Sequence, residues 1–235
     1  MAKCISSQYI AGIDEAGRGC VLGPLVISVC VIPEDKQEYF RQIGVKDSKL
    51  LTKKQREFLF DRIINESVEY KIIVIPAEEL NVLMKEYSLN EIEAQKAAEL
   101  LFSLKTDVSL VYVDSPDVTQ ERFKKRILDN LKLIGGNPKK YNIISEHKAD
   151  FNYPVVGCAS ILSKVTRDSW IKKLTGKDIS GYSSDPKTIS FLKDYIIKYK
   201  KLPEYARTEW KTIDNIMSEL YQKKIGWFNE DGKTK

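Results

Sequence analysis

The feature that most constrains the fold is an alternation of short strand-like runs with helical patterns, up to about residue 175. Capping residues and periodic apolar positions between the runs predict helices. Strands that alternate with helices predict an α/β domain whose sheet is covered by helices. These runs are apolar or rich in β-branched residues, as buried strands are. They cover residues 9–13, 25–32, 67–75, 110–113 and 141–144. The predicted helices are 52–64, 88–104, 118–131 and 153–174.

The pattern changes after about residue 173, where a loop with several glycines leads into two further helical stretches, 188–200 and 212–224, without another strand signal. We therefore predict an α/β domain over residues 1–184 and a small helical extension over 185–235 that packs on it. Trp227 and Phe228 are expected to anchor the end of the extension.

Composition limits the class of protein. The chain has 235 residues, 43% of them hydrophobic, enough for one large domain with a small extension. The 38 Lys and Arg against 33 Asp and Glu give a formal charge of +5, which mildly favours a polyanionic partner. The four cysteines show neither metal-site nor disulfide-scaffold spacing. No apolar run approaches the roughly 18 residues of a membrane span. We expect a cytoplasmic, monomeric protein.

Four carboxylates fall where predicted strands end or a helix begins. Asp14 and Glu15 follow the first strand, Asp114 follows the fourth, and Asp150 precedes the helix 153–174. Functional groups collect at strand ends in α/β sheets, so these acids can converge. Clustered carboxylates repel one another unless a cation neutralises them, and Mg²⁺ and Mn²⁺ prefer such hard oxygen ligands. Two such ions can catalyse phosphodiester hydrolysis without histidine or cysteine.

Simpler explanations compete with a metal site. A single acid after a strand is commonly a helix cap, and Asp114 or Asp150 alone fits that role. The glycines after Glu15 suggest a dinucleotide-binding turn, but their spacing is wrong and the two acids would repel a pyrophosphate. His147 is expected to be a loop residue rather than a general base, since a metal-bound water needs no histidine.

Several motifs, in order along the chain, resemble the type 2 ribonucleases H, most closely their archaeal branch. They are IDEAGRG, GPLV, DSK, VDSPD, EHKADFNYPVVGCASILSKVTRD and SGYSSDP. The resemblance implies a ribonuclease H-like fold with a mixed five-stranded sheet flanked by helices. It also implies an endonuclease that cuts the RNA strand of RNA–DNA hybrids and incises on the 5′ side of a single ribonucleotide in duplex DNA, leaving 3′-hydroxyl and 5′-phosphate ends.

The same resemblance implies residue roles. It makes the four acids ligands of two Mg²⁺ or Mn²⁺ ions, and it makes Tyr182 a residue that stacks on the sugar at the RNA-to-DNA junction. The loop that senses the ribose 2′-hydroxyl would be Gly17, Arg18 and Gly19. Cys20 and Ser183 depart from the family pattern, which has proline at both positions.

Other interpretations and partners remain open. Lys49 and Lys164 are expected to contact substrate phosphates. A DNA nuclease or resolvase could use similar acids on the same fold, and a catalytically silent nucleic-acid-binding module is a further alternative. The expected substrates are RNA–DNA hybrids and DNA duplexes containing ribonucleotides, and a sliding clamp is a conceivable partner that these residues do not reveal.

Overall fold

One mixed sheet forms the centre of the molecule, in a computed structural model that describes residues 8–45 and 51–230, with side chains as far as residue 220. Its five strands lie in the order β3-β2-β1-β4-β5. β1 pairs antiparallel with β2 and parallel with β4, β2 pairs antiparallel with β3, and β4 pairs parallel with β5. The strands are β1 (Tyr9–Ala16), β2 (Leu25–Pro33), β3 (Glu69–Ile75), β4 (Leu110–Asp114) and β5 (Asn142–Glu146).

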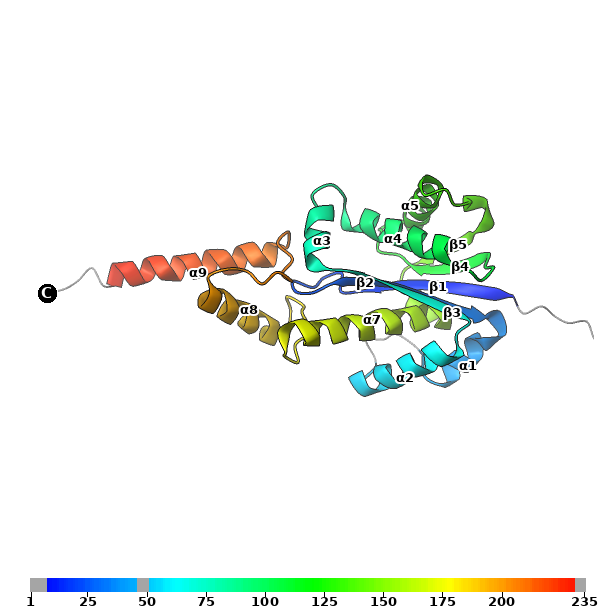
Figure 1. Cartoon of the computed structure of the whole chain (residues 1–235), viewed down its shortest axis with the longest axis horizontal. Helices are drawn as coiled ribbons and strands as arrows, with labels where there is room; N and C mark the ends of the chain where they lie inside the picture. Colours follow the sequence, from blue (N-terminus) through cyan, green and yellow to red (C-terminus); the bar gives the residue numbers. More distant parts are fainter. Residues whose placement is uncertain (1–7, 46–50, 231–235) are drawn as a thin grey trace, which may run out of the picture.

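Helices cover both faces of this sheet (Figure 1). One face carries α3 (Ala77–Leu83), α4 (Leu89–Ser103) and α5 (Gln120–Leu133). The other carries α1 (Gln37–Gln42), α2 (Lys53–Glu66), α6 (Ala149–Asn152) and α7 (Pro154–Thr175). An apolar core fills the space on each side. The predicted fold class, a mixed five-stranded sheet flanked by helices, is confirmed.

Residues alternate between the two faces along β1, as the period of a strand requires. Ala11 and Ile13 pack into the core under α4 and α5, whereas Ile10 packs into the core under α7. Gly12 lies against α7, where an added Cβ would come within 2.4 Å of the Val155 carbonyl carbon. The missing side chain therefore lets α7 approach the centre of the sheet, close to the acids near the end of β1.

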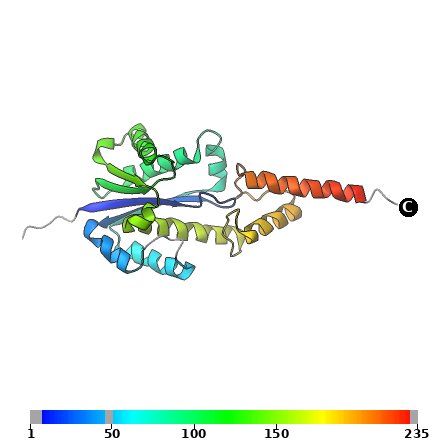
Figure 2. The same ribbon diagram turned by 180° about the vertical axis from the view of Figure 1, so that it is seen from behind.

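The C-terminal helices lie beyond the end of the sheet in the opposite views of Figures 1 and 2. They are α8 (Pro186–Tyr199) and α9 (Lys211–Glu230). Their apolar residues belong to a third hydrophobic cluster. Leu192 and Ile213 of this extension pack with Val21, Leu22 and Ile171 of the main body. The division at residues 184 and 185 stays a prediction. The side chains of Trp227 and Phe228 lie outside the described part.

Most differences from the predicted elements are at their ends. β1 continues to Ala16 because its pairing with β2 runs as far as Ala16 and Val26, so Asp14 and Glu15 lie inside the strand rather than after it. The short helices α1, α3 and α6 were not predicted, because six, seven and four residues carry too little periodicity. No helix in the described ranges is long and apolar enough to cross a membrane.

Candidate active site

Three of the four predicted acids converge where β1 and β4 lie side by side. Carboxylate oxygens of Asp14, Glu15 and Asp114 all lie within 4.8 Å of one another. The parallel pairing of β1 with β4 brings about this meeting, because it aligns the ends of the two strands. Asp150, in α6, is outside this 4.8 Å group, but it is buried, and its charge acts on Asp14.

The electrostatics of Asp14 fit a cation site. Burial, followed by the charges of Glu15, Asp114 and Asp150, raises the pKa of Asp14 well above its usual value, and a hydrogen bond from Ser160 opposes this rise. Like charges gathered in a buried place disfavour ionisation until a positive charge joins them. The donors are all hard carboxylate oxygens, which match Mg²⁺ and Mn²⁺ rather than zinc or copper. The residues present therefore fit a divalent ion.

Hydrogen bonds hold the acids in place. The Glu15 amide donates to Asp14 Oδ1 at 2.8 Å, and Ser163 Oγ of α7 donates to the Asp14 carbonyl at 3.0 Å. Asp114 Oδ1 accepts from the Ala149 amide at 2.8 Å. Asp114 thus accepts a capping-type bond, as the simpler explanation allowed, but from the first residue of α6 rather than from the helix near residue 118. That bond ties α6, and with it Asp150, to the end of β4.

The predicted recognition loop and Tyr182 are brought together. Gly17 has a φ of +93°, and an added Cβ there would come within 2.7 Å of the Pro24 carbonyl oxygen and 2.8 Å of Arg167 Cδ. A Cβ on Gly19 would be in ordinary contact with the Tyr182 ring, at 3.8 Å. An isolated β-bridge joins Cys20 to Tyr182. The loop backbone therefore lies next to the aromatic residue predicted to act with it.

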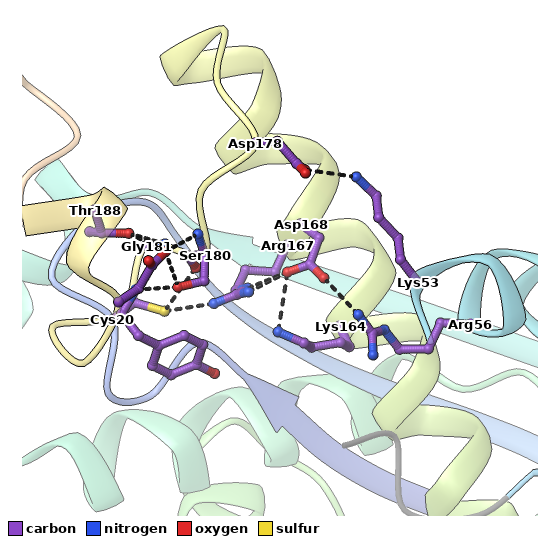
Figure 3. Close-up of polar contacts among 12 residues, drawn as sticks. Cys20, Lys53, Arg56, Lys164, Arg167, Asp168, Asp178, Ser180, Gly181 and Thr188 are labelled. Carbon is purple, nitrogen blue, oxygen red and sulfur yellow. Dashed lines mark hydrogen bonds and ion pairs between the residues drawn. The ribbon is translucent and has the colours of Figure 1, made fainter. Parts of the chain in front are cut away.

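A charged network that joins Cys20, Lys164, Arg167 and Asp168 (Figure 3) lies beside Tyr182. Arg167 is 1% exposed, and its guanidinium donates to Asp168 and, from Nη1, to Cys20 Sγ at 2.7 Å. Lys164 Nζ lies 3.2 Å from Asp168 Oδ1 and 5.3 Å from the Tyr182 ring centroid. Asp168 thereby pairs with two cations beside the ring and neutralises them in part. Cys20 is one of the two residues that depart from the family pattern, and its sulfur accepts a hydrogen bond from Arg167.

Two other predicted residues differ in their outcome. Lys49 falls in residues 46–50, outside the described residues, so its role stays a prediction. His147 Nδ1 lies 3.0 Å from the Ser115 carbonyl oxygen, and Nε2 lies 3.4 Å from that of Val118. The histidine therefore joins the turn after β5 to the loop after β4, which agrees with the expected loop role.

A second set of charged residues, which the sequence patterns did not predict, lies behind the loop. Glu93 of α4 pairs with the Arg18 guanidinium, and it lines a cavity of about 10 Å³, room for about one water, together with Asp14, Glu15 and Asp114. Burial, then the charge of Glu15, raises the pKa of Glu93 well above its usual value. One sequence pattern could have indicated Glu93: Ala97 and Leu101 follow it at helical spacing, so an acid stands in line with the apolar face of the helix.

Residues near the C-terminus support the same loop. Arg207 is fully buried and donates from Nε to the Gly23 carbonyl at 2.9 Å and from Nη1 to the Arg18 carbonyl at 3.2 Å. Its amide donates to Val21, and a β-bridge joins Leu22 to Ala206. No local pattern indicated this contact, since 189 positions separate Arg18 from Arg207.

A mixed sheet of this order, with one buried and two half-buried carboxylates where β1 and β4 meet, is typical of a nuclease of the ribonuclease H-like class. The family model for Ribonuclease HII matches residues 11–213. The chain belongs to the Ribonuclease HII family. It is accordingly a metal-dependent hydrolytic endonuclease, a ribonuclease acting on the RNA strand of RNA–DNA hybrids.

Individual relatives agree over nearly their whole length. Ribonuclease HII of Methanocaldococcus jannaschii is 43% identical over 228 residues, which cover 93% of this chain and 99% of that protein. The crystal structure of ribonuclease H2 from Pyrococcus horikoshii OT3 is similar with a TM-score of 0.80 and 43% identity, covering 90% of this chain and 98% of that chain. The structure of the PCNA:RNase HII complex from Archaeoglobus fulgidus contains a chain that is 37% identical, with a TM-score of 0.75. The match covers 86% of this chain and 95% of that chain.

Proposed function

We propose that this ribonuclease also incises duplex DNA on the 5′ side of a single embedded ribonucleotide, leaving 3′-hydroxyl and 5′-phosphate ends. The observation that carries the proposal is the placement of Gly19 against the Tyr182 ring, on the loop that directly follows Asp14 and Glu15. A 2′-hydroxyl both donates and accepts hydrogen bonds, so closely approaching backbone groups of a glycine loop can recognise it. An aromatic ring beside that loop offers a surface for the next sugar.

The proposed metal ligands are Asp14, Glu15, Asp114 and Asp150, which would hold two Mg²⁺ or Mn²⁺ ions. The chemistry that such ions supply is activation of water and stabilisation of the leaving oxygen. The protein contributes fixed ligand positions: Ser163 and the Ala149 amide orient Asp14 and Asp114. It also contributes a site whose like charges favour cation binding, as the raised pKa of Asp14 indicates.

The proposed substrate contacts lie on both sides of the loop. Gly17, Arg18 and Gly19 would read the ribose, and Tyr182 would stack on the following sugar. Lys164, beside the Tyr182 ring, would contact a phosphate, and Lys49 is proposed for a similar role. A lysine that contacts a phosphate releases bound counterions, so we expect substrate binding to weaken as the salt concentration rises. Asp168, which pairs with Arg167 and Lys164, reduces the share that Lys164 contributes to this effect.

The cellular role proposed here is removal of ribonucleotides from DNA, in ribonucleotide excision repair and replication. A monomer in the cytoplasm is proposed, and the free thiols of Cys20, Cys30 and Cys158 suit a reducing compartment. A sliding clamp is a proposed partner, supported by the Archaeoglobus relative that was solved with PCNA.

Cleavage of matched labelled duplexes tests the proposal. One duplex carries a single ribonucleotide, one is all DNA, and one is an RNA–DNA hybrid, each assayed with Mg²⁺, with Mn²⁺ and with EDTA. We expect metal-dependent cuts in the first and third duplexes only, with the first cut 5′ to the ribonucleotide. Cleavage of the all-DNA duplex would favour a DNA nuclease, and binding of all three without cleavage would favour a silent binding module.

A further inference from the structure

Glu93 is a buried acid that the proposed chemistry does not use. Its side chain is 3% exposed, and its carboxylate pairs with Arg18 Nη1. Its second oxygen, Oε1, is buried and has no hydrogen-bond partner within the described part of the chain. Buried polar atoms without partners are rare in folded proteins, and each calls for a physical reason.

Arg207 presents the complementary feature. Its Nη2 is buried and also lacks a hydrogen-bond partner among the described residues, while its charge acts on Glu93. Its other nitrogens donate to the carbonyls of Gly23 and Arg18. Glu93 therefore pairs with the guanidinium of Arg18, in the loop, and is also within reach of the charge of Arg207, in the segment before α9.

A second anchor fixes the Arg18 guanidinium. Arg18 Nη2 donates to Asn90 Oδ1, and Asn90 Nδ2 donates to Asp117 Oδ1 at 2.5 Å. Asp117 Oδ2 in turn accepts from Arg126 Nε at 3.0 Å. The first two turns of α4 thus hold both terminal nitrogens of Arg18, so the guanidinium has one defined orientation rather than the freedom of a surface arginine.

This arrangement stands directly beside the acids. Glu93 lines the same small cavity as Asp14, Glu15 and Asp114. The pair is buried on the Glu93 side only, since the Arg18 side chain is 35% exposed. A buried charge that is paired in this way adds little to stability over apolar residues of similar volume, and its best-attested use is to impose a unique geometry. The geometry imposed here is that of the loop at the edge of the acid cluster.

We propose that Glu93 is a positioning residue for ribose recognition: its carboxylate holds Arg18, and through it the loop of Gly17, Arg18 and Gly19, in register with the acids. The inference rests on the proposed function of that loop. Because small displacements of a bound substrate strongly reduce the rate of its reaction, loss of Glu93 lowers kcat more than it raises KM.

The test compares Glu93→Gln with Glu99→Gln, a matched change on the same helix at a half-exposed acid that pairs with Lys96. On the single-ribonucleotide duplex, E93Q is expected to lower kcat about tenfold and to change KM less than about threefold, while E99Q stays within about twofold of wild type. In an Arg18→Ala background, E93Q is expected to lower kcat by less than about twofold, because the effect passes through Arg18. An unchanged kcat for E93Q, or an equal loss in the R18A background, overturns the proposal.

Melting curves show whether E93Q remains folded. If it does not, Asn90→Ala, which removes the second anchor of Arg18 and leaves Glu93 in place, is expected to lower kcat about threefold, and this loss too is expected to disappear in the R18A background. A kcat for N90A equal to that of wild type contradicts the proposal in that case.

A substrate-free measurement separates this inference from the proposed function. In ¹⁵N-labelled protein, E93Q is expected to shift the amide resonances of Gly17 and Gly19, and E99Q is expected to leave them in place. If wild type cuts neither ribonucleotide-containing duplex, the proposed function fails, yet these shifts still support Glu93 as the residue that positions the loop. Resonances of Gly17 and Gly19 that do not move in E93Q overturn the positioning role whatever the activity.

Discussion

The guanidinium carbon of Arg167 lies 4.8 Å from the ring centroid of Tyr182. This contact fixes the ring beside the recognition loop, because Arg167 is itself buried, neutralised by Asp168 and hydrogen-bonded to Cys20. A cation over an aromatic face attracts it by about 0.5–2 kcal/mol. Tyr182 is thus held from the protein side by α7, which suits the stacking role proposed for its ring.

We predict that Tyr182→Ala loses much more activity on a single embedded ribonucleotide than on several consecutive ribonucleotides. Only the first substrate depends on one junction. Stacking contacts contribute about 1–3 kcal/mol, so the expected loss in kcat/KM is roughly tenfold to a hundredfold. The measurement is kcat/KM on both substrates together with a melting curve. Tyr182→Phe is the control and should keep most of the activity, and equal losses on the two substrates would remove the junction role.

Asp14→Asn is expected to nearly abolish cleavage while leaving binding of a hybrid largely intact. The change keeps the shape of the side chain but removes charge from the group that would bind the metal ions and stabilise the transition state. Cleavage and gel-shift assays in saturating Mg²⁺ check this, with EDTA-treated wild type as the reference for loss of metal. Turnover at the wild-type rate in D14N would refute the ligand assignment.

The same substitution should stabilise the metal-free protein at neutral pH. The folded-state pKa of Asp14 is raised above its usual value of 3.8, first by burial and then by neighbouring acids. Ionisation of Asp14 therefore destabilises the folded protein. The free energy of unfolding is highest below pH 3.8 and falls as the pH rises through the higher folded-state pKa. In EDTA, the Tm of D14N should exceed that of wild type above about pH 4, and the difference should grow as the pH rises further.

Added Mg²⁺ provides the control for that comparison. A cation that binds only the folded state stabilises it, so wild type should gain more Tm from Mg²⁺ than D14N does. If the Tm of D14N in EDTA at neutral pH is lower than that of wild type, burial and repulsion among the acids do not destabilise the metal-free protein as proposed.

Asp185→Ala is expected to destabilise the protein by about 1 kcal/mol, as loss of a helix N-cap does. Asp185 caps α8 through the Lys187 amide, and it accepts from the Ser180 amide and hydroxyl and from the Thr188 hydroxyl. Burial alone would raise its pKa, but these hydrogen bonds lower it to about 2. Its stabilising effect is therefore full above pH 3.8 and is lost as the pH falls through about 2.

Urea unfolding of D185A and wild type between pH 2 and pH 7 measures this difference. Asp178→Ala is the control, because it removes an exposed acid from a surface pair with Lys53 and should change stability by less than about 0.5 kcal/mol. A D185A deficit that does not shrink toward pH 2 would contradict the role assigned to the ionised carboxylate.

The sequence predicted those features of the fold and the site that are caused by residues close together in the chain. The apolar runs, the Thr52 and Ser88 caps and the acids at strand ends are local patterns, and they predicted strands, helices and carboxylates close to where they lie. The motif resemblance identified the loop and Tyr182 together, and the structure places them in contact. The short helices α1, α3 and α6 have no such pattern, because their boundaries depend on packing against the rest of the molecule.

The sequence by itself determined which chemical groups are present and near which elements they lie: carboxylates at the ends of the first and fourth strands and before the helix 153–174, and a glycine loop after the first pair. Only the tertiary structure decided which of them meet. It joined Asp14, Glu15 and Asp114 within 4.8 Å, left Asp150 outside that group, and brought Glu93 and Arg207 behind Arg18. The physical reason is that such contacts join residues 75 and 189 positions apart, so sheet pairing and helix packing create them, and no periodicity or spacing along the chain encodes them.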